Sequence, residues 1–140
     1  MTPPGARTAD ALIKVPFHDL DPAGIVWHGN YLRYLEIARC ALLDTFDYNY
    51  DRMMASGYAW PIIEQRVRHM GPARFGDVLR VHARLAEWEH RLRIEYLVTN
   101  TAGEGRVCKA TTIQVAVHIP TGEMCVVSPD VLFERLGVAR

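Results

Sequence analysis

A single long helix, apolar on most of its sides, is the feature that most constrains how this chain can fold. Between residues 31 and 46 the apolar side chains recur so closely that they cover most of a helical surface. These residues are Tyr31, Leu32, Tyr34, Leu35, Ala38, Leu42 and Phe46, and the narrow, mainly polar stripe consists of Arg33, Glu36, Cys40, Asp44 and Asp47. Such a helix has to be covered by other elements, so we expect it at the centre of the core.

The rest of the chain is mostly strand-like. A short apolar run precedes the helix at residues 11–17, and residues 48–56 follow it as an irregular or short helical extension. Further strands are expected at residues 59–69, 78–88, 92–99, 106–119 and 124–127, with a terminal turn of helix at 129–136. This order predicts an α+β fold in which the inner face of a sheet packs on the helix.

The length of the chain fits one domain. A domain near 140 residues buries roughly 70% of the surface that its unfolded chain exposes, which is enough for one core. Residues 1–10 are small, polar and rich in proline, and we interpret them as a flexible N-terminal segment. Residues 11–140 then form the single domain, without an internal repeat or a linker.

The charge and the cysteine content limit which partners the protein is expected to bind and in which cellular compartment it is expected. Sixteen basic and sixteen acidic residues give a formal net charge of zero, so no sequence-wide basic field attracts nucleic acid or an anionic membrane. The first residues lack the apolar centre of a secretory signal, and no run approaches the roughly 18 apolar residues of a membrane span. The spacings of Cys40, Cys108 and Cys125 match no zinc or redox motif, which predicts reduced, mostly buried thiols in a cytoplasmic protein.

The segment from Asp21 to Tyr31 carries the residues best suited to chemistry. Asp21, Pro22 and Gly24 fit a type I turn whose first residue accepts hydrogen bonds from nearby amides and points outward. Asn30 is a preferred N-cap residue, and we expect its side-chain oxygen to bond an early amide of the helix. Free N–H groups at a helix start favour an oxyanion. A carboxylate beside them could activate water or attack a carbonyl carbon, which is the chemistry of acyl-group hydrolysis.

Structural roles are the alternative for these side chains. Asp21 could serve only to cap its turn, and His28 could only bond the backbone near the helix start. His18, Asp19, Asp21 and His28 also offer ligand types for a metal ion. They show neither the HExxH spacing nor a cysteine framework, so no metal is expected.

The absence of several sequence motifs excludes other reaction types. The only serines are Ser56 and Ser128, and neither lies in a G-x-S-x-G motif, which excludes a nucleophile-elbow hydrolase. The chain contains no G-x-G-x-x-G motif and no P-loop, so no nucleotide cofactor is expected. A carboxylate mechanism without a cofactor is what remains.

Residues 17–31, followed by Tyr34 and Glu36 on the helix, resemble the signature of hotdog-fold acyl-CoA thioesterases of the 4-hydroxybenzoyl-CoA thioesterase family. Residues 71–77 resemble the lead-in to the third strand of that family, and the order of elements matches along nearly the whole chain. The resemblance implies a hotdog fold, in which an antiparallel sheet of five to six strands wraps around one long central helix. It also implies hydrolysis of an acyl-CoA thioester.

The resemblance assigns roles to individual residues of the motif. Asp21 falls on the catalytic carboxylate, which acts as nucleophile or general base. His28 falls where one branch carries a functional histidine and the aroyl-CoA branch a tyrosine, and the backbone N–H groups of His28 and Gly29 match the oxyanion donors. The candidate substrate contacts in this segment are Gly24, Val26, Trp27 and Tyr31. Aromatic side chains at helical spacing usually fill interiors, so Trp27 and Tyr31 are also candidates for the core.

A second group of candidates lies outside the motif. In the resembling family, a basic cluster after a tryptophan between two strands is thought to hold coenzyme A phosphates; here His90 and Arg91 match it, whereas Glu89 is acidic. Hotdog proteins form homodimers, often dimers of dimers, and build each active site from two subunits. The second strand of the partner, from Trp60 to Glu64, would border the acyl pocket, although a salt bridge is another use for Glu64.

The resemblance leaves the substrate open. Short- or medium-chain and aromatic acyl-CoA thioesters both fit, and Glu89 is a reason to consider a thioester of an acyl carrier protein, as in polyketide or pigment pathways. A hotdog dehydratase or hydratase is an alternative, but such enzymes carry Asp and His at a closer spacing than Asp21 and His28. A non-catalytic module that binds acyl thioesters is a further alternative, and the intact motif argues against it.

Overall fold

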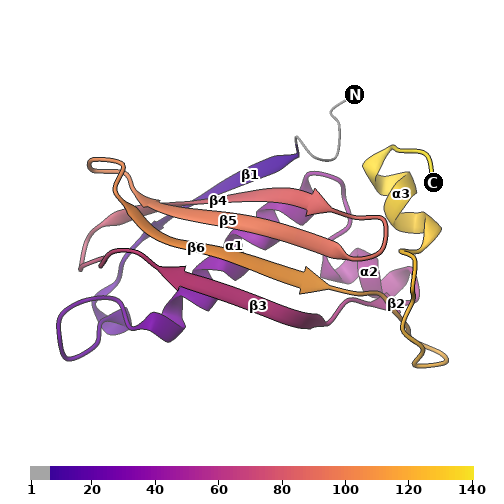
Figure 1. The fold of residues 1–140 in the computed structure, drawn as a ribbon, viewed down its shortest axis with the longest axis horizontal. Helices are drawn as coiled ribbons and strands as arrows, with labels where there is room; N and C mark the ends of the chain where they lie inside the picture. Colours follow the sequence, from indigo (N-terminus) through magenta and orange to yellow (C-terminus); the bar gives the residue numbers. More distant parts are fainter. Residues whose placement is uncertain (1–6) are drawn as a thin grey trace.

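A computed structural model describes residues 7–140, which form a five-stranded antiparallel sheet with one long helix behind it (Figure 1). The strands, in their spatial order, are β1 (Thr8–Lys14), β4 (Val78–Glu87), β5 (Leu92–Asn100), β6 (Arg106–Gln114) and β3 (Ile62–His69). Helix α1 (Tyr31–Asp44) packs against β1 and β4. The predicted α+β fold with one central helix is therefore confirmed.

Short elements complete the chain. They are two 3₁₀ turns, η2 (Phe17–Asp19) and η3 (His28–Asn30), the helices α2 (Tyr50–Ala55) and α3 (Asp130–Leu136), and a two-stranded sheet of β2 (Tyr58–Ala59) and β7 (Val117–His118). The strand expected at 59–69 is thus split after Ala59, next to Pro61, which has no N–H to donate to a ladder. The brief strand expected at 124–127 is reduced to an isolated bridge between Met124 and Val117.

The first strand begins earlier than the sequence pattern indicated. Residues 8–10, which were expected in the flexible N-terminal segment, pair with β4, with Thr8 opposite Arg84 and Asp10 opposite His82. The remainder of that segment, residues 1–6, lies outside the described residues. The apolar run at residues 11–17 did not indicate this start, because Thr8 and Asp10 are polar and face outward.

Strand alternation places the core between the sheet and α1. In β4 and β5 every second side chain is buried, for example Val81 and Ile94, and the side chains between them face outward. On α1 the buried side chains include Leu35, Ala38 and Leu42. All three cysteines of the chain are free thiols; Cys108 is buried and Cys40 and Cys125 are half-buried, and burial raises the pKa of Cys108 to about 12.

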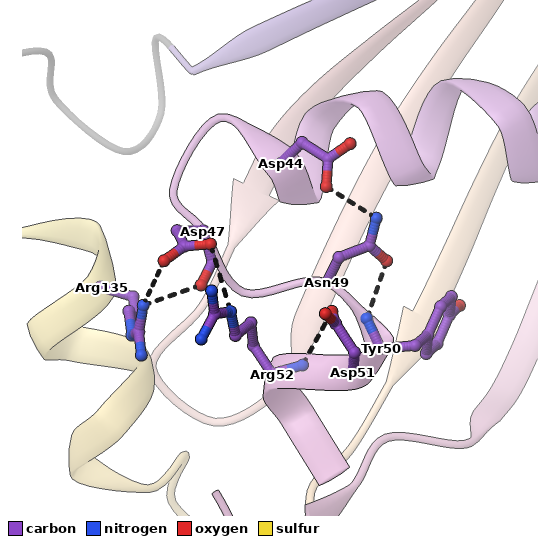
Figure 2. Close-up of polar contacts among 7 residues, drawn as sticks. All are labelled: Asp44, Asp47, Asn49, Tyr50, Asp51, Arg52 and Arg135. Carbon is purple, nitrogen blue, oxygen red and sulfur yellow. Dashed lines mark hydrogen bonds and ion pairs between the residues drawn. The ribbon is translucent and has the colours of Figure 1, made fainter. Parts of the chain in front are cut away.

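A polar cluster joins the end of α1 to α2 and α3, as Figure 2 shows. Asp47 has a left-handed backbone (φ 50°), and its carboxylate binds Arg52 of α2 at 3.6 Å and Arg135 of α3 at 2.7 Å. Asn49 begins α2 by accepting a hydrogen bond from the backbone N–H of Tyr50, and its Nδ2 donates to Asp44. These contacts fix the end of the molecule opposite the Asp21 turn.

The edge strand β3 is exposed on both of its faces. Seven of its eight residues are exposed and only Val67 is half-buried, which makes β3 unlike β4 and β5. The apolar side chains of Ile62 and Ile63 are 38% and 58% exposed, and Ile37 on α1 is 52% exposed. A sheet edge whose backbone N–H and C=O groups are unpaired is normally covered by another element or another chain.

Candidate active site

The turn that begins at Asp21 has the predicted geometry. The N–H of Gly24 donates to the carbonyl of Asp21 at 3.0 Å, and Gly24 has φ +79°. Asp21 Oδ1 accepts the N–H of Ala23 at 2.8 Å and that of Ile25 at 3.4 Å. Within residues 7–140 the carboxylate of Asp21 takes part in no ion pair, and its Oδ2 accepts no side-chain or turn hydrogen bond. The turn therefore holds one carboxylate oxygen and leaves the other available.

A different carboxylate, that of Asp19, anchors the loop to α1. Asp19 is buried, its Oδ2 accepts the hydroxyl of Tyr34 at 2.6 Å, and its Oδ1 pairs with Arg33. Burial by itself would raise the pKa of Asp19, but the hydrogen bonds from Tyr34 and Arg33 outweigh it, so the pKa lies below its ordinary value of 3.8. Burial and the hydrogen bond to Asp19 raise the pKa of Tyr34 above its ordinary value. Asp19 is thus a structural anion, and Asp21 is the free one.

Asn30 does not cap α1 through its side chain, contrary to the prediction. Its backbone is already helical, because η3 runs directly into α1. Its side-chain amide instead donates to the carbonyl of Asp19 at 2.9 Å, and its Oδ1 accepts from Arg33 at 3.1 Å. Asn30 therefore ties the loop to the helix and leaves the first amides of the helical segment unblocked.

The backbone N–H groups of His28 and Gly29 donate to no described residue of the chain (7–140). Trp27 lies directly over Gly29, since a Cβ on Gly29 would come within 2.3 Å of the Trp27 ring. Only glycine allows this approach of the indole. Two free amides at the start of a helical segment are donors suited to an oxyanion.

Asp21 and His28 line one cavity with a volume of about 460 Å³. The remaining lining residues are Ile25, Val26, Tyr31, His69, Met70, Gly71 and Pro72. The cavity joins the Asp21 loop, the start of α1 and the residues that end and follow β3. Its size falls within the usual range for sites that bind small ligands.

His69 lines the cavity although it was not among the site residues predicted from the sequence. Its ring centroid is 6.3 Å from that of His28 and 5.6 Å from that of Tyr31. Tyr31 is buried, and burial raises its pKa to about 12, so its hydroxyl stays protonated near neutral pH. The only signal for His69 in the sequence was its position just before the 71–77 motif.

The other predicted substrate contacts lie elsewhere in this chain. Gly24 and Trp27 are exposed and do not line the cavity. Trp60 is buried, donates from Nε1 to the Tyr48 hydroxyl at 3.2 Å, and lines a separate apolar cavity of about 350 Å³. Glu64 is exposed on the edge strand β3.

His90 and Arg91 lie in the turn between β4 and β5. The strand register places this turn at the end of the sheet opposite the Asp21 cavity (Figure 1). Arg91 pairs with Glu87 at 3.1 Å, and His90 contacts the carbonyl of Val126 at 3.2 Å. Within one chain these two residues therefore do not join the site.

Neither a metal centre nor a membrane span is found in the part of the chain that the structure describes. Among residues 7–140, no group of three or more His, Cys, Asp or Glu side chains could hold a metal ion. Within the same range, no helix is long and apolar enough to cross a membrane.

Comparisons with known proteins identify the family and the fold of the chain. The sequence profile of the Thioesterase-like superfamily matches residues 15–134. The chain is 29% identical over 106 residues to YneP of Bacillus subtilis, named as an acyl-CoA thioesterase, covering 75% of this chain and 76% of that protein. It is 28% identical over 109 residues to the 4-hydroxybenzoyl-CoA thioesterase of Pseudomonas sp. (strain CBS-3), covering 73% and 75%. A 1,4-dihydroxy-2-naphthoyl-CoA thioesterase from Synechocystis has the same fold, with a TM-score of 0.82, 20% identity and coverage of 93% and 96%.

The fold is that of a hotdog protein. The loop that precedes α1 carries the carboxylate of Asp21 and the backbone N–H groups of His28 and Gly29, which donate to no described residue. The chain belongs to the thioesterase-like superfamily. It is a thioester hydrolase.

Proposed function

We propose that the protein hydrolyses acyl-CoA thioesters in the Asp21 cavity, with Asp21 as the nucleophile or general base. The observation that carries the proposal is a carboxylate oxygen of Asp21, free within residues 7–140, in the cavity that His28 also lines. The backbone N–H groups of His28 and of its neighbour Gly29 form no hydrogen bond within the same residues. If a thioester carbonyl lay between them, the carboxylate would face its carbon atom and the amide N–H groups would donate to its oxygen atom.

The two routes share the same groups. In one, Asp21 attacks the carbonyl carbon and the thiolate leaves, forming an acyl-enzyme anhydride that water then hydrolyses. In the other, Asp21 takes a proton from a water molecule that attacks the same carbon. In both routes, the developing oxyanion accepts hydrogen bonds from the backbone N–H groups of His28 and Gly29. The imidazole of His28 orients the water or the thioester, or protonates the thiolate, which needs little help because a thiol is already a moderate acid.

The walls of the cavity support a compact acyl group. Apolar side chains (Ile25, Val26 and Pro72) and the ring of Tyr31 line it together with two imidazoles. The volume of about 460 Å³ suits a short, medium or aromatic acyl chain. We therefore propose these acyl-CoA classes as substrates.

A thiol-release assay on purified protein tests this function. The panel contains hexanoyl-CoA, benzoyl-CoA, palmitoyl-CoA and a hexanoyl thioester of acyl carrier protein, and crotonyl-CoA reports hydration. Hexanoyl-CoA or benzoyl-CoA is expected to release thiol fastest. Water addition to crotonyl-CoA without release of thiol from any substrate would contradict the proposal, and release from the carrier-protein thioester alone would identify the other carrier.

We also propose that β3 pairs with its copy in a homodimer. Pairing two copies of β3 about a twofold axis would cover the exposed edge and bring the Ile62 end of one strand to the His69 end of the other. The segment around Trp60 and Glu64 of the partner subunit would then border the Asp21 cavity. Two such dimers would associate through another surface to form a dimer of dimers.

Sedimentation equilibrium checks the dimer. The wild type is expected at twice the mass of one chain or at four times that mass, since the exposed β3 edge and Ile63 are covered in the assembly. Ile63→Lys is expected to weaken the association, and Met54→Lys, an equally exposed apolar side chain on α2, serves as the control. A stable monomer that hydrolyses thioesters at the full rate would disprove this assembly.

A further inference from the structure

The outer face of the sheet carries a hollow surrounded by cations. It has a volume of about 660 Å³ and lies on the side of the sheet away from α1. Its cationic side chains are Arg66 and Arg68 of β3, Arg84 of β4, Arg93 of β5 and Lys109 of β6. Leu97 and Thr111 lie between them. We call this site the basic hollow.

The positive charge of the basic hollow is mostly uncompensated. Its one carboxylate, Glu95, pairs with both Arg84 at 2.5 Å and Arg93 at 3.4 Å. Among the described residues, Arg66, Arg68 and Lys109 form no ion pair with a carboxylate. This accumulation occurs in a chain whose formal net charge is zero, so it is a local feature and does not follow from composition.

The strand register brings two of these cations face to face. Arg68 of β3 is directly opposite Lys109 of β6. Like charges in opposed positions destabilise a sheet. An anion that bound both side chains would relieve this repulsion.

We propose that the basic hollow binds a small ligand that carries a pyrophosphate group, such as a free nucleoside diphosphate. Guanidinium and ammonium groups on several strands surround the hollow and match the several oxygens of linked phosphates. Leu97 provides an apolar surface for the remainder of the ligand. A volume of about 660 Å³ is that of a small-molecule site and exceeds what a single phosphate requires.

The site is separate from the proposed thioester site. Consecutive residues of β3 point to opposite faces of the sheet, so Arg68 faces the basic hollow and His69 faces the Asp21 cavity. A second copy of the chain is a poor occupant, because symmetric contact would place the same cations against each other. Pairing of β3 edges would leave the outer face open.

Isothermal titration calorimetry at low salt tests the proposal, with inorganic pyrophosphate, ADP, coenzyme A and uncharged adenosine as probes. Pyrophosphate and ADP are expected to bind and adenosine is not. The double variant Arg68→Gln with Lys109→Gln is expected to weaken ADP binding about tenfold or more, because two charge-assisted contacts are lost. The matched control, Arg52→Gln with Arg140→Gln, removes two exposed cations outside the hollow and should change the affinity less than twofold.

Two further readouts separate this site from hydrolysis and from a folding defect. Asp21→Asn is expected to bind ADP as the wild type does, whatever its effect on thioesters. The double variant is expected to melt at the same or a higher temperature, since it removes a like-charge pair. Absence of ADP binding, binding of coenzyme A without binding of pyrophosphate or ADP, or equal losses in both double variants would each overturn the proposal.

Discussion

Replacing Asp21 with Asn is expected to lower the turnover of thioester hydrolysis by about 100-fold to 1000-fold or more. The loss of one well-placed oxyanion donor already costs that much, and the carboxylate is the attacking or proton-accepting group. The fold should remain, because the Asn side chain keeps the Oδ1 that accepts the N–H groups of Ala23 and Ile25. Steady-state thiol release and circular dichroism measure the two effects.

A matched control strengthens the Asp21 experiment. Asp51 is an exposed aspartate in α2, and its Oδ1 also accepts a backbone N–H, that of Arg52. Asp51→Asn should keep the full rate. Hydrolysis by Asp21→Asn at the wild-type rate would refute the role of this carboxylate, and equal losses in both variants would attribute the effect to general charge.

Replacing Asp19 with Ala is expected to lower the free energy of unfolding by about 2–3 kcal/mol. The change leaves the buried hydroxyl of Tyr34 without its acceptor and removes the partner of Arg33. Chemical denaturation measures the loss. Asp10→Ala, which removes an exposed pair with His82, is the control and should cost less than about 1 kcal/mol.

Asp19 also predicts how stability changes in acid. Its pKa is lower in the folded protein than the ordinary value of 3.8, so the unfolded chain takes up this proton first. Its contribution is complete above about pH 4 and is lost as pH falls through the folded pKa. Denaturation midpoints from pH 6 downward should therefore fall less steeply for Asp19→Ala than for the wild type. Parallel curves would contradict the assignment of Asp19 as a stabilising anion.

Local sequence determined the elements and the turn. Helix α1 and the strands β4 and β5 follow from the spacing of apolar residues, since burial on one face imposes a period of 3.6 or 2. The Asp21 turn follows from Pro22 and Gly24, whose backbone preferences act within four residues. The loop of residues 21–29 could also be predicted, because Asp21, His28 and Gly29 lie within nine residues of one another.

Tertiary structure alone decided which distant groups meet. His69 reaches the cavity from 41 positions beyond His28, through strand pairing that no local pattern encodes. The burial of Asp19 against Tyr34 similarly separated the structural carboxylate from the free one, although both stand in the same motif. Cations scattered over four strands became one basic hollow only because antiparallel register aligned their outward faces. Periodicity fixes which face a residue occupies, whereas long-range pairing fixes its neighbours.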